Sequence, residues 1–374
     1  MRVAVVVALG AAAVGALRMP PARRGALGAP RRSARGAAVG DPSGAGGVAS
    51  AQLLLARVAR PARVGWRFTR PHTFVGTALS VPALHALAAP SAAAALTPAF
   101  AASVCAALGP ALLVNVFITG LNQLCDVDID RVNKPHLPVA SGELAMRDGA
   151  AIAAAALAGA ALLGCDARLG SEPLRRVLLG SALLGFAYSA PPLRLKRSPE
   201  RRSPALAAAC IVAVRAVLVN TCFYAHAAAR AFPEGAARAA ADARLGLVVA
   251  FFGAFSVAIA LMKDVPDVAG DARYGVRTLS RALGRQRVFD GAAAVLVATL
   301  AAAAAGLAAA AAAAETAARA ATRAGLAAVL AAAAADAAAR ARAVDAEAGG
   351  AVAAFYMHLW KCFFLCYALL PFAR

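Results

Sequence analysis

Long runs of apolar residues alternate with short polar segments from about residue 72 to the C-terminus. The runs are continuous and rich in Ala, Leu and Val, without the alternating pattern of a membrane β-strand. Only helices and closed barrels satisfy their backbone polar groups inside lipid, so the pattern predicts an all-α polytopic membrane protein. We expect about nine transmembrane helices, at residues 72–90, 100–121, 147–165, 177–190, 205–229, 244–262, 288–311, 324–341 and 351–370.

Two of these spans have unusual sequences. The fourth is short and ends at Pro191-Pro192, a pair that a helix does not readily cross. The eighth is almost pure Ala but contains Asp336 and Arg340, which leaves open whether it crosses the membrane fully.

The composition agrees with a membrane protein. Of 374 residues, 61% are hydrophobic and 16% are charged, and the mean hydropathy is +0.67. Soluble proteins use about half apolar residues, so most soluble folds, disordered chains and secreted disulfide scaffolds are excluded. The seven Cys form no CxxC pair, which indicates small buried hydrophobes rather than zinc ligands or disulfides.

The first 50 residues predict a targeting sequence. Residues 3–17 form an apolar stretch too short to span a membrane, and an Arg-rich segment without acidic residues follows until Asp41. A signal-like core before a transit-like segment suggests two-step import into a plastid with additional membranes; the alternative is a single transit peptide. We therefore expect a targeting segment over 1–50 and a membrane domain over 51–374.

The net charge of +20 follows the connections between spans. Arg and Lys are concentrated before the first span and after spans 2, 4 and 6, and are fewer after spans 1, 3 and 5. The positive-inside rule then places the N-terminus and the even-numbered connections on one side, the stromal side of a plastid membrane. No interleaving of basic and aromatic residues suggests nucleic-acid binding, and no protein partner is predicted.

Two acidic clusters follow even-numbered spans, so they would share that side. On a continuous helix after span 2, Asn122, Asp126, Asp130 and Asn133 lie on one face, whereas Asp128 points elsewhere. Asp264, Asp267 and Asp271 share a face after span 6. Carboxylates at a membrane edge are costly unless they are paired or functional.

Mg²⁺ suits such a ligand set, because it takes one or two carboxylates and fills its other positions with water and phosphate oxygens. Neighbouring Lys and Arg side chains favour a Mg²⁺–diphosphate complex over a lone ion. The alternative is that these carboxylates are solvated and simply matched to Arg residues in the loops.

At these residues the sequence resembles the UbiA-type intramembrane prenyltransferases, most closely the homogentisate prenyltransferases of plastids. NQLCDVDIDRVNKPHLPVASGE and KDVPDVAGDARYGVRTLSRALGRQRVF resemble the two Asp-rich motifs of that family. Further similarity lies in WRFTRPHTFVGT, YSAPPLRLKR, VRAVLVNTCFYAH and FYMHLWKCFFLCYALLPFAR, so that the resemblance covers about residues 66–374. The broad family often has Asp at the position of Gln123, whereas the homogentisate branch resembles this sequence there.

The resemblance implies a helical bundle around a central cavity open to lipid, and Mg²⁺-dependent transfer of a phytyl or geranylgeranyl group to homogentisate with decarboxylation, a step of tocopherol synthesis. It implies Asp126, Asp130, Asp264, Asp267 and Asp271 as metal ligands and Lys196 beside them in catalysis. It implies substrate contacts for Asn122, Arg70, Lys134, Tyr188, Arg197, Lys263 and Asp264. The spacing from Tyr188 to Lys196 is longer than in the bacterial quinone enzymes.

Several alternatives stay open at this point. Solanesyl transfer to homogentisate and a chlorophyll synthase-like reaction are related possibilities, and a Mg²⁺ or metabolite transporter is the non-enzyme alternative. Within span 5, Arg215, Asn220 and His226 either form interhelical hydrogen bonds or contact substrate. His72 is a candidate for contact with the acceptor. Trp66 and Trp360 are expected, from their residue type, to be interfacial anchors.

Overall fold

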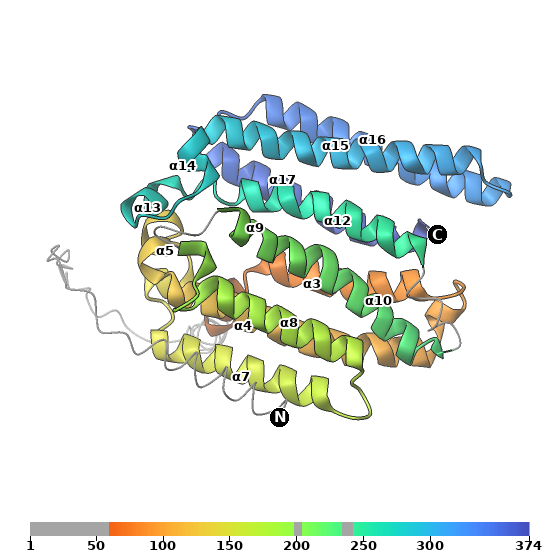
Figure 1. Ribbon diagram of the computed structural model, residues 1–374, viewed down its shortest axis with the longest axis horizontal. Helices are drawn as coiled ribbons and strands as arrows, with labels where there is room; N and C mark the ends of the chain where they lie inside the picture. Colours follow the sequence, from red (N-terminus) through yellow and green to blue (C-terminus); the bar gives the residue numbers. More distant parts are fainter. Residues whose placement is uncertain (1–59, 198–203, 234–241, 374) are drawn as a thin grey trace, which may run out of the picture.

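The structure is a computed structural model that describes residues 60–197, 204–233 and 242–373. The predicted targeting segment over 1–50 lies outside the described residues. Within the described part the regular secondary structure is helical, as predicted. The long helices run side by side along the longest axis, and three short helices gather at one end of the bundle, α5 (Val127–Asn133), α13 (Val268–Arg273) and α14 (Leu279–Leu283) (Figure 1).

Each predicted span corresponds to a helix. Seven segments of the described chain are long and apolar enough to cross a membrane, and α3 and α8 are 18-residue helices at the first and fourth predicted positions. The bounds are α3 (Pro71–Ala88), α4 (Pro98–Cys125), α7 (Met146–Cys165), α8 (Glu172–Ser189), α9 (Pro204–Val212), the π-helix η3 (Ala213–Leu218), α10 (Val219–Arg230), α12 (Ala243–Met262), α15 (Arg285–Ala312), α16 (Ala317–Arg342) and α17 (Gly349–Leu369).

Local sequence accounts for where several helices begin and end. The Thr97 hydroxyl accepts a hydrogen bond from the Phe100 amide at the start of α4, and Ser171 does the same for Leu174 at the start of α8. Helix α8 ends at Ser189, just before the proline pair, as its sequence predicts.

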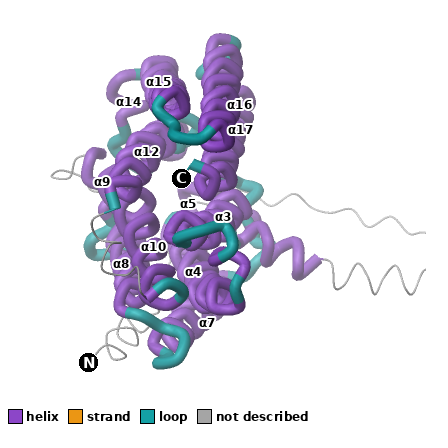
Figure 2. The backbone as a smooth tube through the Cα atoms, turned by 90° about the vertical axis from the view of Figure 1, so that its right-hand side faces the viewer, coloured by secondary structure: helices purple, strands orange, loops and turns teal. Residues whose placement is uncertain are grey.

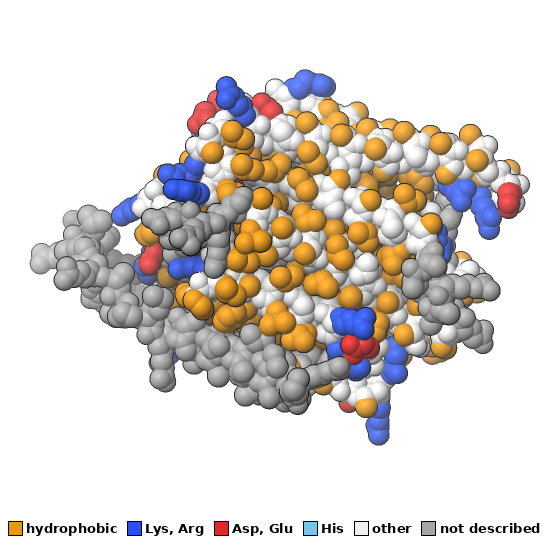
Figure 3. Space-filling model, viewed as in Figure 1, with side chains coloured by type: hydrophobic (Ala, Val, Ile, Leu, Met, Phe, Trp, Pro, Cys, Tyr) orange, Lys and Arg blue, Asp and Glu red, His pale blue; other side chains and the backbone are white. Residues whose placement is uncertain are grey.

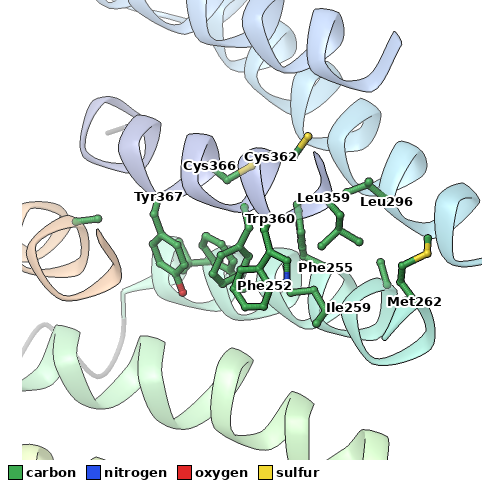
Figure 4. Packing of buried hydrophobic residues seen from close by; sticks show 14 of the residues in the cluster. Phe252, Phe255, Ile259, Met262, Leu296, Leu359, Trp360, Cys362, Cys366 and Tyr367 are labelled. Carbon is green, nitrogen blue, oxygen red and sulfur yellow. The ribbon is translucent and has the colours of Figure 1, made fainter. Parts of the chain in front are cut away.

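The core lies where α12, α17, α3 and α15 pack together. Phe252 stacks on Tyr367 with ring centroids 4.0 Å apart, and Phe363 meets both rings edge-on. Figure 4 shows the side chains of α12 and α17, including Phe252, Phe255 and Trp360, interleaved between the two helices. This aromatic layer fixes α17 against α12.

A second apolar cluster holds the chain before α3 against α4. Phe68 is buried here, and it lies so close to Gly120 that a Cβ on that glycine would be 2.7 Å from the Phe68 ring. Glycine therefore permits the approach that places residues 67–70 beside the end of α4.

The surface pattern agrees with a membrane location. In Figure 3, apolar side chains cover the middle of the visible face, and Lys and Arg lie largely around its margin. Figure 2, turned by 90°, shows α15 and α16 as a hairpin standing out from the rest of the bundle.

Candidate active site

The two acidic motifs meet at one end of the bundle. Helix α4 stops at Cys125 and the chain continues as α5 (Val127–Asn133), while α12 is followed by α13 (Val268–Arg273). The Asn133 Nδ2 donates a hydrogen bond to the Asp267 carbonyl at 2.8 Å, and its Oδ1 accepts one from the Gly270 amide at 2.7 Å. Residues about 135 apart in the chain thus form one site.

The continuous polar stripe expected after span 2 is wrong in one respect. The helix breaks at Asp126, whose backbone has φ −106° and ψ 11°, and α5 starts afresh behind it. Asn133 faces the second motif and serves as a connector, with both ends of its amide in use. Asp128 points away, as expected, and pairs with Arg131 on the surface.

Asp126 is the most heavily hydrogen-bonded carboxylate of the site. It is 1% exposed, and its Oδ2 accepts bonds from Asn122 Nδ2 at 2.7 Å and Lys196 Nζ at 3.0 Å. Arg194 lies 3.6 Å from the other oxygen. Burial alone would lower the pKa of Lys196, but the charge of Asp126 and the nearby Tyr188 raise it, so the ammonium stays protonated.

Asp130 faces the chain that leads into α3. Arg70 lies 3.8 Å from its Oδ2, an oxygen that is buried and makes no hydrogen bond. Burial raises the pKa of Asp130, and Arg70 and Lys134 only partly oppose this. Arg70 itself adopts a left-handed φ of 51° directly before Pro71, which turns the chain into the helix.

The second motif supplies two buried carboxylates. Asp267 is paired with Lys134, while its Oδ1 has no hydrogen-bond partner. Burial would raise the pKa of Asp267, but Lys134 and Lys196 bring it below the ordinary value. Asp271 has no ion-pair partner among the described side chains, and burial, with the charge of Asp267 next, raises its pKa to about 7.

Lys263, Asp264 and Tyr188 form the side of the site between α12 and α8. Lys263 Nζ lies 2.6 Å from Asp264 and 5.7 Å from the centre of the Tyr188 ring. Tyr188 also interacts with Lys196. The Tyr188 side chain is therefore close to two of the lysines predicted to belong to the site, Lys196 and Lys263. The side chain of Arg197, also predicted, lies outside the described residues.

Sequence reasoning missed Arg194 as a site residue. It belongs to the basic connection after the fourth span, and it reaches Asp126 and the Cys125 carbonyl. Its backbone has φ 32°, a left-handed conformation that a sequence pattern does not reveal. Gln123, in contrast, forms no hydrogen bond with an acidic residue in the described part of the chain; its amide donates to the Phe68 carbonyl at 2.8 Å.

Among the site side chains named above, the formal charges balance when every carboxylate is ionised. Five carboxylates are matched by five cationic side chains at the same end of the bundle, namely Asp126, Asp130, Asp264, Asp267, Asp271, Arg70, Lys134, Arg194, Lys196 and Lys263. A diphosphate alone would add about three negative charges to this balanced site. Divalent cations entering with the diphosphate would offset them.

The oxygen donors of the two motifs fit Mg²⁺ only together with ligands from outside the protein. No three His, Cys, Asp or Glu side chains in the described chain lie close enough to hold a metal by themselves. Buried oxygens without hydrogen bonds nevertheless occur on both motifs, at Asp130 Oδ2, Asp267 Oδ1 and Asp271 Oδ1. Such oxygens fit an ion that takes one or two carboxylates and completes its coordination with phosphate and water.

The polar residues predicted within the membrane separate into two groups. Asn220 accepts a hydrogen bond from the Tyr367 hydroxyl at 2.9 Å, and His226 contacts Ser171 and Ser103 of other helices. For these two the interhelical alternative is confirmed. Arg215 forms no interhelical hydrogen bond with the described side chains; it lies over the Trp360 ring instead. Trp360 is 0% exposed, so the prediction that it is an interfacial anchor is wrong.

Comparisons of the sequence and of the fold with known proteins agree on one protein family. Residues 79–362 match the UbiA prenyltransferase family. The chain is 38% identical to homogentisate phytyltransferase 1, chloroplastic, of Arabidopsis thaliana, over 83% of this chain and 75% of that one. It is also 38% identical to homogentisate phytyltransferase of Synechocystis sp., over 82% and 94%. A solved UbiA homolog from Archaeoglobus fulgidus bound to GPP and Mg²⁺ shares the fold, with a TM-score of 0.50 and 16% identity over 82% of this chain and 99% of that one.

Proposed function

Because this chain belongs to the UbiA prenyltransferase family, we propose that it transfers a phytyl or geranylgeranyl group from its diphosphate to homogentisate, as a step of tocopherol synthesis. One observation carries the proposal: the two acidic motifs meet through Asn133 at one end of the bundle and are lined there with lysines and arginines. The similarity to homogentisate phytyltransferases names the two substrates.

Each acidic motif would contribute ligands to Mg²⁺. The unbonded oxygens of Asp130, Asp267 and Asp271 are the first candidates, with Asp126 and Asp264 completing the set and Asn122 holding Asp126 in place. Bound Mg²⁺ would supply Lewis-acid stabilisation of the diphosphate as negative charge develops on its oxygens.

Lysines and arginines now paired with the carboxylates are the residues that would bind the diphosphate. Lys196 is positioned by Asp126, and Lys134 by Asp267, so that one ammonium comes with each motif. Both are largely enclosed, and a charge placed in such a water-poor site stabilises a developing anion far more than it would in water. Arg70, Lys263 and Arg197 would complete the cationic wall.

The proposed reaction breaks the allylic C–O bond of the prenyl diphosphate, and the diphosphate leaves with the electron pair. An electron-rich ring carbon of homogentisate forms the new C–C bond and loses its proton. The carboxylate of the acceptor leaves as CO₂, and the remaining methylene carbon takes up a proton. Placing the allylic cation among apolar helices protects it from water.

The protein would act within a plastid membrane, with the site on the stromal side. Support comes from the apolar helices, from the basic residues clustered at the end that holds the site, and from relatives described as chloroplastic. A transporter would place its acids within the spans. Here the acids of the site follow α4 and α12.

The test uses membranes that contain the full chain. Homogentisate or chlorophyllide is incubated with phytyl, geranylgeranyl or solanesyl diphosphate, with Mg²⁺ or with EDTA, and the prenylated product and CO₂ are quantified. We expect turnover with phytyl or geranylgeranyl diphosphate that EDTA abolishes. A preference for solanesyl diphosphate, or for chlorophyllide as acceptor, would assign the chain to the corresponding alternative. Turnover that persists in EDTA would refute the magnesium site.

A further inference from the structure

An arginine without an acidic partner lies inside the bundle, away from the acidic motifs. Arg215 is on η3, the π-helical turn in the middle of the span Pro204–Arg230. Its guanidinium carbon is 4.8 Å from the centre of the Trp360 ring and 6.0 Å from that of Phe363. A π-turn inside a helix often marks a functional position, because it re-aims one side chain at the expense of regular hydrogen bonding.

The charge of Arg215 is not balanced within the protein. Among the described residues its side chain forms neither a hydrogen bond nor an ion pair, and its titratable neighbours Tyr356 and Tyr367 carry phenols that are uncharged at neutral pH. A cation within a membrane span is costly unless an anion or a polar cavity accompanies it. Stacking on Trp360 offsets only part of that cost.

Arg215 is connected to the acidic site by a short row of side chains. Trp360 lies between Arg215 and His72, whose ring centroid is 4.9 Å from that of the indole. His72 follows Arg70 by two residues, and Arg70 pairs with Asp130. Arg70 and Arg215 both lie within electrostatic reach of the His72 ring. The row therefore leads from the first acidic motif to the unpaired guanidinium.

We propose that Arg215 binds the carboxylate of the aromatic acceptor and thereby selects an acidic acceptor over a neutral phenol. The inference rests on the proposed function, since it deepens the acceptor side of the same reaction. A guanidinium presents two parallel N–H donors that match a carboxylate. The rings of Trp360 and His72 would flank the acceptor ring, between the guanidinium and the metal-binding end.

The charge of the ligand favours the acceptor over the prenyl diphosphate as the partner of Arg215. The diphosphate already has five cations and the acidic motifs at the end of the bundle. One isolated cation beside aromatic rings suits a monoanion that carries its own ring. The same guanidinium would otherwise serve only as a cation–π contact that packs η3 against α17, and the experiment separates these roles.

The test compares the charged acceptor with a neutral copy of it. In membranes with the full chain we measure the KM for homogentisate, the inhibition constant of homogentisate methyl ester and the KM for the prenyl diphosphate. For Arg215→Gln we expect the KM for homogentisate to rise about 30-fold, in line with the loss of a charge-assisted bidentate pair. The ester's inhibition constant and the KM for the diphosphate should stay at wild-type values. Arg215→Lys should fall between wild type and Gln.

Arg340→Gln is the matched control, because Arg340 also lies in an apolar helix but is paired with Asp336 on α16. Its constants should equal those of the wild type. Equal weakening of homogentisate and its ester in Arg215→Gln would reveal a packing role and overturn the inference. A rise in the KM for the diphosphate alone would assign Arg215 to that substrate and overturn it too.

A binding measurement separates failure of this inference from failure of the proposed function. Trp66→Phe leaves Trp360 as the single tryptophan, so its fluorescence reports ligand binding beside Arg215. Homogentisate should quench this fluorescence in Trp66→Phe but not in the double variant Trp66→Phe/Arg215→Gln. That result supports the carboxylate site even if homogentisate is not turned over. If Arg215→Gln does not accumulate, Arg215→Lys is used in the same assay. Turnover of homogentisate without quenching, or with quenching unchanged in the variant, would refute the site while leaving the reaction intact.

Discussion

Asn133 on α5 holds the backbone of Asp267, because its Nδ2 donates to the Asp267 carbonyl at 2.8 Å. The same side chain accepts from the Gly270 amide at 2.7 Å. One amide thus fixes the distance between the two acidic motifs without being a ligand in either. The geometry of the proposed metal site depends on this connection as much as on the carboxylates.

Asn133→Ala should therefore impair activity although it removes no ligand. Two hydrogen bonds are lost and the Gly270 amide is left without its partner, at a cost of about 1–3 kcal/mol in folding free energy. We expect a lower melting temperature and a higher Mg²⁺ concentration for half-maximal activity. Activity assays over a Mg²⁺ series and thermal unfolding in detergent measure both effects.

Gly270→Ala should disrupt the same pair of hydrogen bonds, since a Cβ at residue 270 would be 2.5 Å from Asn133 Oδ1. We therefore expect it to lower activity in the same way as Asn133→Ala. Gly291→Ala is the control, because nothing lies within 4 Å of its Cβ position on α15. If the Gly270 variant behaved like the Gly291 variant, the connection would have no functional weight.

Asp126→Asn and Asp267→Asn should each reduce turnover at least about 100-fold, as the loss of a metal-binding or transition-state contact does. Both substitutions keep the size of the side chain while removing its charge. Asp128→Asn provides the comparison within the first motif, because Asp128 is half-exposed and pairs only with its neighbour Arg131 among the described residues. The measurement is turnover per inserted protein, with product analysis for turnover and an immunoblot for the amount of protein. Near-normal turnover in both Asp126→Asn and Asp267→Asn would contradict the ligand assignment.

The fold was largely predictable because hydrophobic runs, prolines and glycines are local signals. The proline pair after α8 marked the end of that helix correctly. The run of Ala at 324–341 was harder to assess from hydropathy, yet it belongs to α16, which starts earlier, at Ala317. Alanine is the best helix former, so helical structure there does not depend on strongly apolar side chains.

The residues that make up the site were easier to predict from the sequence than the contacts that hold them together. The acids lie together as expected, but the helix breaks at Asp126 and Asn133 bonds to the second motif, and no periodic pattern could signal either feature. Arg194 enters the site through a left-handed backbone conformation. The burial of Trp360 was foreseeable, since it shares one helical face with Tyr356, Phe363 and Tyr367, and residue type alone suggested the interface instead.

Lys196→Met should reduce turnover about 100-fold and raise the KM for the prenyl diphosphate. The ammonium lies 3.0 Å from Asp126 and is positioned to stabilise the departing diphosphate. Methionine keeps much of the apolar stem, so packing changes little. Lys361→Met is the control, because Lys361 is exposed on α17. An unchanged KM for the diphosphate in Lys196→Met would remove this lysine from the substrate site.

Mg²⁺ and diphosphate should stabilise the folded protein only when they are added together. The site holds carboxylates and ammonium groups side by side, so diphosphate alone leaves the carboxylates without a cation and Mg²⁺ alone leaves the lysines without a further anion, whereas the two together match both sets. A ligand that binds the folded state at 100 times its dissociation constant stabilises it by about 2.7 kcal/mol, which a thermal-shift assay in detergent resolves. We expect a clear rise in melting temperature for the wild type and for Asp128→Asn, and almost none for Asp126→Asn or Asp267→Asn. An equal rise in all four proteins would mean that the ions bind elsewhere, because the assay reports binding independently of turnover.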